Sequence, residues 1–254
     1  MKNRTQLIYF TLLLITSLSY GQNLPKFVQV KGGTFTMGDE SGLGNKDQRP
    51  THKVRVKDFN MSQTEVTVAQ YRYYCNETGV GMPKAPSWGW QDNHPMVNVS
   101  WRDAMDYADW LSGKLKQKVR LPYEAEWEYA ARGGKKGRGY KYSGSNNIAD
   151  VSWYDGNSEN KTNAVAGKKA NQLRLYDMSG NAFEWCMDTY GVDYYANSPK
   201  DNPKGATEGD RRIVRGGGWQ LNATFSSVAF RYGSAFDGEL YEYFGFRVVS
   251  IKKK

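Results

Sequence analysis

The sequence predicts an α+β domain with an irregular backbone and little regular secondary structure. Short alternating apolar patterns typical of strands lie within residues 27–59, and three patterns with helical spacing follow between residues 67 and 134. Beyond Gly134 the chain is rich in Gly, Asn, Ser and aromatic residues and has few periodic segments. We therefore expect the second half to consist of long loops, held by the packing of aromatic rings or by bound cations.

The first strand patterns predict a hairpin at the beginning of the domain. Residues 27–38 have a strand-like pattern on both sides of the turn Lys31-Gly32-Gly33, which favours two short paired strands. Residues 53–59 alternate Val54 and Val56 with basic side chains. This second pattern is typical of a strand with one buried face.

Three helices are expected next, over residues 67–79, 100–113 and 122–134. The first carries apolar side chains at helical spacing and ends at a glycine. The second has Ser100 as N-cap with Asp103 three residues later, an arrangement typical of a helix start. A proline opens the third helix, and two glycines end it. The buried face of the second helix should consist of Ala104, Tyr107, Ala108 and Leu111.

The N-terminus has the pattern of a secretory signal. Lys2 and Arg4 precede an apolar run over residues 7–18, and small residues follow it. We expect residues 1–21 to be removed on export, which leaves one domain over residues 22–254 in the periplasm, at the cell surface or in the medium. The apolar run is shorter than the roughly 20 residues that span a bilayer, so the mature chain should not span the membrane. An uncleaved, membrane-tethered form is the alternative.

The charge and the cysteine content argue against several classes of protein. The formal net charge of +9 gives only a weak preference for acidic partners, and the densest basic clusters, residues 135–138 and 252–254, are interpreted as solvated loop and tail. Export argues against nucleic acid as a ligand. The two cysteines, Cys75 and Cys186, are too few for a disulfide-built scaffold. They either pair with each other or remain as two buried free thiols.

Residues 175–185 have the composition of a cation-binding loop. They set Asp177, Asn181 and Glu184 around Gly180. Side-chain and backbone oxygens can then converge on a hard cation such as calcium, which takes about six to eight oxygen ligands. The alternative is a turn in which Asp177 and Asn181 bind backbone groups.

Other titratable groups are interpreted as structural. His52 and His94 have no third imidazole or thiol with which to build a zinc or copper centre. Glu124, Glu126 and Glu128 alternate along the third helix, which directs them to different faces. We expect them to form a solvated first helical turn that also favours the helix dipole.

Several blocks of the sequence match a known family in the right order. They include Gly-Gly-Thr-Phe near the N-terminus, the third helix with its flanks, and Arg-Gly-Gly followed by Gly-Phe-Arg near the C-terminus. Together they resemble the formylglycine-generating enzyme family, also called the sulfatase-modifying factor family, over almost the whole mature chain. The resemblance implies the irregular α+β fold of that family, which is related to C-type lectins. The blocks lie within residues 32–38, 52–67, 94–101, 120–134 and 215–248.

The resemblance also implies two structural calcium sites, which would pin the irregular loops and take no part in catalysis. One corresponds to the cation-binding loop, and the other aligns more loosely with an earlier loop. For this second, looser site the alternative is that Asn157 and Glu159 are solvated loop residues. The ligands of the first would be Asp177, Glu184 and the carbonyls of Gly180 and Ala182, and those of the second would be Asp150, Asn157 and the carbonyls of Val151 and Glu159.

In the family's oxidases, two cysteines shortly after the Arg-Gly-Gly turn bind copper and activate oxygen. The matching positions here are Leu221 and Ser226, and Gly218 stands where the family has a serine. Copper(I) requires soft ligands such as thiolates, which neither residue supplies. The resemblance therefore argues against copper and against formylglycine formation, and we assign no catalytic residue.

A retained framework without its thiols predicts a non-catalytic, calcium-stabilised binding or scaffold protein of the cell envelope. Its partner would be an envelope protein or a glycan. The alternative is an oxygen-dependent oxidase that modifies a protein, such as a sulfatase-type cysteine, or a small molecule through a non-cysteine site. A glycan-binding lectin is a third interpretation. The residues expected to line the binding cleft are Trp219, Asn222, Ser226, Arg231 and Tyr232.

Overall fold

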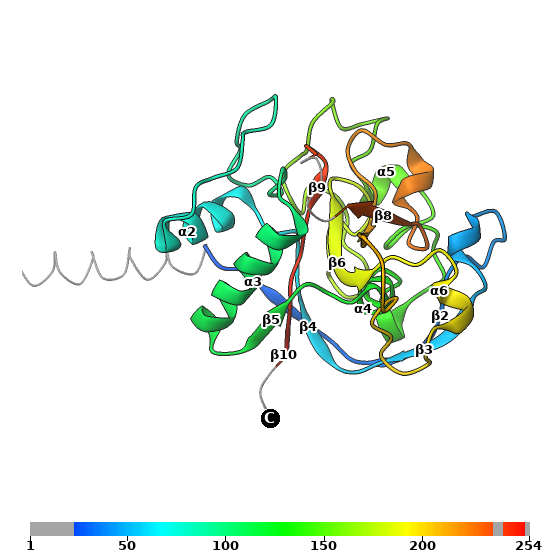
Figure 1. Cartoon of the computed structure of the whole chain (residues 1–254). Helices are drawn as coiled ribbons and strands as arrows, with labels where there is room; N and C mark the ends of the chain where they lie inside the picture. Colours follow the sequence, from blue (N-terminus) through cyan, green and yellow to red (C-terminus); the bar gives the residue numbers. More distant parts are fainter. Residues whose placement is uncertain (1–22, 236–240, 252–254) are drawn as a thin grey trace, which may run out of the picture.

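The computed structural model describes residues 23–235 and 241–251. The expected signal at residues 1–21 and the basic tail at residues 252–254 lie outside the described residues. Within the described ranges, no helix is both long enough and apolar enough to cross a membrane. The predicted α+β class with little regular secondary structure is confirmed, since short strands and helices are joined by long loops (Figure 1).

Three small sheets organise the chain (Figure 1). The first has the strand order β1-β4-β10-β5 and joins both ends of the domain, the second pairs β2 with β3, and the third has the order β8-β7-β6-β9. In the third sheet β6 and β9 are parallel, whereas β7 is antiparallel to both of its neighbours. The strands are β1 (Phe27–Val30), β2 (Gly33–Met37), β3 (His52–Val56), β4 (Phe59–Ser62), β5 (Lys118–Arg120), β6 (Phe183–Thr189), β7 (Arg211–Arg215), β8 (Arg231–Ala235), β9 (Phe244–Gly245) and β10 (Val249–Ile251).

The expected hairpin between β1 and β2 is wrong. β1 pairs with β4 and β2 pairs with β3, in one unbroken register across the two sheets, since Val30 lies opposite Phe59 and Gly33 lies opposite Val56. Gly32 does not turn the chain back. It lets the backbone pass close to the neighbouring strand, because a Cβ at this position would lie 2.4 Å from the Val56 carbonyl oxygen.

The three predicted helices are present as α2, α3 and α4. The capping boxes at Thr67 and Ser100 are formed, and Gly79 ends α2 with φ of 77°. All four side chains expected on the buried face of α3 are buried. This helix continues past the glycine at which we expected it to end, and the third begins at Glu124, two residues after the expected proline. The elements are α2 (Val68–Thr78), α3 (Trp101–Leu115), α4 (Glu124–Ala131), α5 (Ile148–Val151), α6 (Tyr194–Asn197) and the 3₁₀ helices η1 (Lys46–Gln48), η2 (Gly134–Lys136) and η3 (Ala223–Ser226).

The third sheet lies between two apolar clusters. One cluster contains α2 and α3 together with Trp185 of β6 and Val214 of β7. The other cluster contains α4, β2 and β3 together with the adjacent strand residues, Cys186 of β6 and Ile213 of β7. Successive side chains of a strand point to opposite faces, so each strand contributes to both clusters. The sheet thereby fixes α4 and the C-terminal loops relative to each other.

Candidate functional site

The buried face of α4 carries two glutamates that are bound by arginines from the third sheet. Glu124 and Glu128 lie one turn apart and are 1% and 0% exposed. Arg231 donates from Nε and Nη2 to the two oxygens of Glu124, at 2.7 and 2.9 Å, and Arg215 donates from Nη2 to Glu128. The expected solvated helical turn is therefore wrong for both glutamates, whereas Glu126 lies nearer the surface.

Arg132 completes this network at its outer edge. Its Nε donates to Glu128 at 2.8 Å, and its Nη2 donates to the Gly38 carbonyl at 2.6 Å. Burial raises the pKa of Glu128, but the opposing effect of Arg132 and Arg215 prevails and holds it below its usual value. The network ties α4 to the third sheet and to the turn after β2.

The five side chains expected to line one cleft do not share a surface. Arg231 and Ser226 are 1% and 0% exposed, so both belong to the interior. Tyr232, the next residue of β8, faces the opposite way and is 49% exposed. Asn222 caps η3, and Trp219 is largely buried. These burials give the shared cleft no support, so it stays a prediction. The alternation of strand β8 places Arg231 and Tyr232 on opposite faces.

A group of aromatic rings, here called the aromatic face, lies on the side of the third sheet that carries Phe183, which is the side of the cluster with α2 and α3. We define it by Trp88, Phe183, Trp219, Tyr232 and Tyr243. The rings of Phe183 and Tyr232 stack with centroids 6.5 Å apart, and those of Trp88 and Trp219 meet edge to face at 5.2 Å. Glu242 binds the Trp88–Trp219 pair, because its carbonyl accepts a hydrogen bond from the Trp219 indole and its carboxylate accepts one from the Ser87 N–H. The next residue, Tyr243, reaches the other pair, since its ring centroid lies 6.5 Å from that of Phe183.

The two positions that would carry copper-binding thiols have no donor set for copper. The Leu221 side chain packs against the apolar core. The Ser226 hydroxyl is buried and has no hydrogen-bond partner among the described residues. It lies close to the glycine turn, since a Cβ on Gly217 would lie 2.8 Å from the Ser226 Oγ. A methyl group and a hydroxyl do not fit copper(I).

The cysteines are both free and buried, which selects one of the two alternatives left open by the sequence. Cys75 lies in α2 and Cys186 lies in β6, in different apolar clusters. Burial raises the pKa of both thiols. They are therefore predominantly protonated at neutral pH and poor as metal ligands.

Asp177 and Glu184, which the sequence places in one calcium site, lie in a buried carboxylate cluster with Glu65. Glu184 accepts hydrogen bonds from Arg247 Nε and Nη2, at 2.6 and 2.7 Å, and from the Trp127 indole at 2.6 Å. The Oδ2 atom of Asp177 accepts a hydrogen bond from the backbone N–H of Ala166. The Asp177 Oδ1 and both oxygens of Glu65 find no donor in the described part of the chain when both groups are ionised. The two carboxyl groups lie close enough to share a hydrogen bond when one of them is protonated.

The charges of this cluster are unbalanced, because Arg247 is the cation that faces its three carboxyl groups. Burial raises the pKa of Asp177 to about 6 and raises that of Glu65 well above its usual value. A hard cation such as calcium takes oxygen ligands, but among the described residues no group of three or more His, Cys, Asp or Glu side chains is arranged to hold a metal ion. Calcium at this cluster therefore stays a prediction. Sequence reasoning missed Glu65, since it lies far from Asp177 in the chain and only the fold joins them.

The second expected calcium site gains no similar support, and it stays a prediction. The Asn157 amide binds backbone groups of its own turn, at 3.0 Å on each side. Asp150 lies 3.4 Å from the Lys169 ammonium, and the Glu159 side chain is 82% exposed. The carbonyl of Val151 would be its fourth ligand.

Comparisons with known proteins agree with this architecture. Residues 17–252 match the family model described as the sulfatase-modifying factor enzyme 1-like domain. A formylglycine-generating enzyme of Streptomyces coelicolor is 33% identical, over 78% of this chain and 80% of that protein. A protein named chaperone protein LppX, from Paenibacillus barcinonensis, is 29% identical over 78% of this chain and 85% of its own length. The structure of PvdO from Pseudomonas aeruginosa superposes with a TM-score of 0.79 at 29% identity, over 90% of this chain and 95% of that one.

Proposed function

Because this chain belongs to the sulfatase-modifying factor enzyme 1-like family, we propose that it is a non-catalytic, calcium-stabilised binding or scaffold protein of the cell envelope. The observation that carries the proposal is the chemistry of the two thiol positions. Leu221 offers only an apolar side chain, and Ser226 offers a buried hydroxyl. Neither can hold copper(I) as a thiolate does. Cys75 and Cys186 do not replace the missing pair, since they lie apart in the two apolar clusters.

Calcium would have a structural role in this protein. Asp177 and Glu184, with the carbonyls of Gly180 and Ala182, would hold it, and the buried carboxyl group of Glu65 lies beside them. The bound ion would supply positive charge in the interior and would join the loop around Asp177 to the end of β4 and to β6. Its binding free energy would add to the stability of the folded state.

The aromatic face would be the surface that meets a partner. Tyr232 is half exposed on it, and the rings beneath hold Tyr232 in a fixed orientation. Large rigid rings contribute much contact area at a small cost in side-chain entropy, which suits binding to an envelope protein or a glycan. The comparisons support a binding role in one respect, because a relative that matches over most of its length is named as a chaperone.

Affinity capture from envelope extract tests the binding role. The protein and its Tyr232→Ala variant would be immobilised side by side, with Val80→Ser as the control, since Val80 is 46% exposed elsewhere on the molecule. The proposal expects one partner or glycan that is retained by the protein and by the control and is lost with Tyr232→Ala. Capture that is equal on all three, or no capture, would contradict it.

The oxidase alternative has no comparable support. Arg231, the side chain on which it would most depend, is bound at both ends of its guanidinium by Glu124 and by backbone carbonyls. It is therefore occupied in the interior and does not face a substrate.

A further inference from the structure

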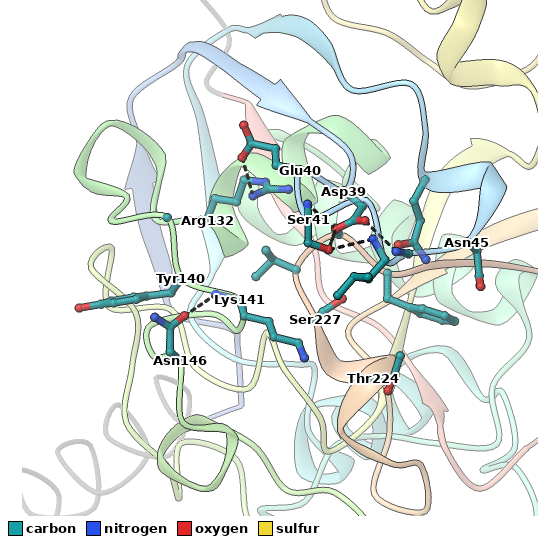
Figure 2. Close-up of a pocket in the computed structure, with 17 residues that line it drawn as sticks. Asp39, Glu40, Ser41, Asn45, Arg132, Tyr140, Lys141, Asn146, Thr224 and Ser227 are labelled. Atoms are coloured by element: carbon teal, nitrogen blue, oxygen red, sulfur yellow. Dashed lines mark hydrogen bonds and ion pairs between the residues drawn. The ribbon is translucent and has the colours of Figure 1, made fainter.

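A cavity of about 370 Å³ lies beside η3, which contributes Thr224 to its lining. Three segments enclose it: the loop after β2, the loop after η2, and η3 with the chain that leads to β8 (Figure 2). Its volume lies within the range of roughly 300–1,000 Å³ that is typical of small-molecule sites. The thiol positions take no part in it, because Leu221 and Ser226 are absent from its lining.

The floor of the cavity is apolar and firmly held. Val228, Ala229 and Phe230 form it, and all three are at least nine-tenths buried. Arg215 binds the carbonyls of Val228 and Ala229 at 2.8 and 3.0 Å, which fixes this backbone from below. The floor therefore offers a preformed apolar contact for the body of a ligand.

Two of the four charged side chains that line the cavity are fully occupied. Asp39 accepts hydrogen bonds from two N–H groups and a hydroxyl of its own loop, at 2.7 to 3.1 Å. Arg132 is held by Glu128 and by the Gly38 carbonyl. The exposed Glu40 carboxylate lies 3.9 Å from Arg132, so the two largely balance each other.

Asp39 keeps its negative charge within its own loop, and Lys141 is the charged side chain of the lining that no hydrogen bond or ion pair holds among the described residues. Its ammonium lies 5.3 Å from the centre of the Tyr142 ring, and no carboxylate pairs with it in the described part of the chain. Figure 2 shows its side chain extending from the side of Tyr140 and Asn146 towards Thr224. Thr224 of η3 and Ser227, which directly follows η3, add hydroxyl groups to the lining.

We propose that this cavity binds a small organic monocarboxylate with an aromatic or branched aliphatic body. The carboxylate would lie between the Lys141 ammonium and the hydroxyls of Thr224 and Ser227, and the body would lie on the floor formed by Val228, Ala229 and Phe230. One ammonium and two hydroxyls match a single negative charge, whereas a phosphoryl group requires more cationic donors. This site is independent of the aromatic face and of the calcium site.

Titration of the whole mature protein with matched acids and amides tests the assignment. The probes are 3-phenylpropionate and 4-methylpentanoate, each paired with its primary amide, and binding is followed by calorimetry and by amide NMR shifts. We expect saturable binding of at least one acid, at least tenfold tighter than its amide, with shifts confined to the three segments around the cavity. Equal binding of acid and amide, no saturable binding of either acid, or equal competition by inorganic phosphate would overturn the proposal.

Substitutions at two exposed positions of the lining, Lys141 and Thr224, locate the site. Lys141→Met should reduce the affinity for the acid to that for the amide, and Lys141→Arg should retain most of it. Lys168→Met is the matched control, because Lys168 also lies over an aromatic ring, that of Trp153, but outside the cavity. Thr224→Trp should block binding by filling the mouth. Thermal unfolding verifies that each variant is folded, and an effect of Lys168→Met equal to that of Lys141→Met would contradict the assignment.

Discussion

Arg231 and Glu124 form a two-point ion pair that joins the third sheet to α4, with donor–acceptor distances of 2.7 and 2.9 Å and both side chains at most 1% exposed. Arg231 belongs to the C-terminal segment, residues 215–248, that carries the resemblance to the family, whereas Glu124 begins α4. The burial of the pair and its partners identify it as part of the framework. A buried pair of this kind holds the third sheet against α4 without any contribution from a thiol.

Breaking this pair should destabilise the protein strongly. Arg231→Met leaves the Glu124 carboxylate buried without its partner, which typically costs about 3–5 kcal/mol of unfolding free energy. Urea unfolding measures the loss. The double variant Arg231→Met with Glu124→Leu should recover part of it, since no unpaired charge remains.

The matched control for that experiment is Arg55→Met. Arg55 and Asp201 form a pair of similar geometry whose side chains are 61% and 51% exposed. Solvated pairs contribute little to stability, so the urea midpoint should not change. An equal loss for the two arginines would contradict the framework role of Arg231.

Calcium should raise the stability of the folded protein, and its removal should lower it. Addition of EGTA is expected to decrease the unfolding temperature, and Asp177→Asn and Glu65→Gln should each abolish most of that decrease. A site filled at about one hundred times its dissociation constant contributes roughly 2.7 kcal/mol. Scanning calorimetry with and without calcium measures the effect.

Asp150→Asn distinguishes the two expected calcium sites in the same measurement. If the ion binds at Asp177, this variant should respond to EGTA as the unmodified protein does. An unfolding temperature that EGTA leaves unchanged in the unmodified protein would contradict the calcium proposal, and loss of the response in Asp150→Asn alone would assign it to the other loop.

Protons and calcium should compete for the cluster around Asp177. In the calcium-free protein the pKa of Asp177 is raised from 3.8 to about 6, so the folded state holds a proton that the unfolded state releases more readily. Its contribution to stability is complete below about pH 4 and is lost as the pH rises through about 6. The burial of Glu65 acts in the same direction.

Urea midpoints between pH 4 and 7.5 in EGTA measure this dependence. Asp177→Asn should flatten it, because the amide does not titrate. With calcium present the affinity for the ion should rise through the same range, since the ligand must be deprotonated. If the urea midpoints of the calcium-free protein and of its Asp177→Asn variant changed equally with pH, this assignment would be contradicted.

Introducing both thiols should produce copper(I) binding, whereas one thiol alone should not. Leu221→Cys with Ser226→Cys supplies two soft ligands in the retained framework, and each single variant supplies one. Competition with a copper(I) chelator measures the affinity. We expect tight binding by the double variant only, and binding of equal strength by the unmodified protein would show that other groups hold the metal.

Local patterns in the sequence predicted much of the fold. The capping residues Thr67 and Ser100 and the helix-ending Gly79 specify their helices through hydrogen bonds and conformations confined to a few neighbouring residues. The pairing of β1 with β4 could not be predicted in this way. Gly32 has the composition of a turn, and only its close approach to the Val56 carbonyl shows that the chain continues straight.

The candidate sites were less accessible to sequence reasoning for the same reason. Glu124 and Glu128 look like a solvated helical turn until the arginines of the third sheet are placed against them. Glu65 meets Asp177 only in the folded chain. The cavity beside Lys141 is formed by three segments that are far apart in sequence, and no motif in any one of them indicates a ligand.

The most direct test of the central claim is an activity measurement on the folded protein. The mature chain, loaded with calcium and supplied with oxygen, would be incubated with and without copper together with a cysteine-containing sulfatase-type peptide, and the peptide would be read by mass spectrometry. A non-catalytic protein leaves the cysteine unchanged in every condition. Conversion of the cysteine to formylglycine would contradict the account and would require a metal-binding group other than Leu221 and Ser226.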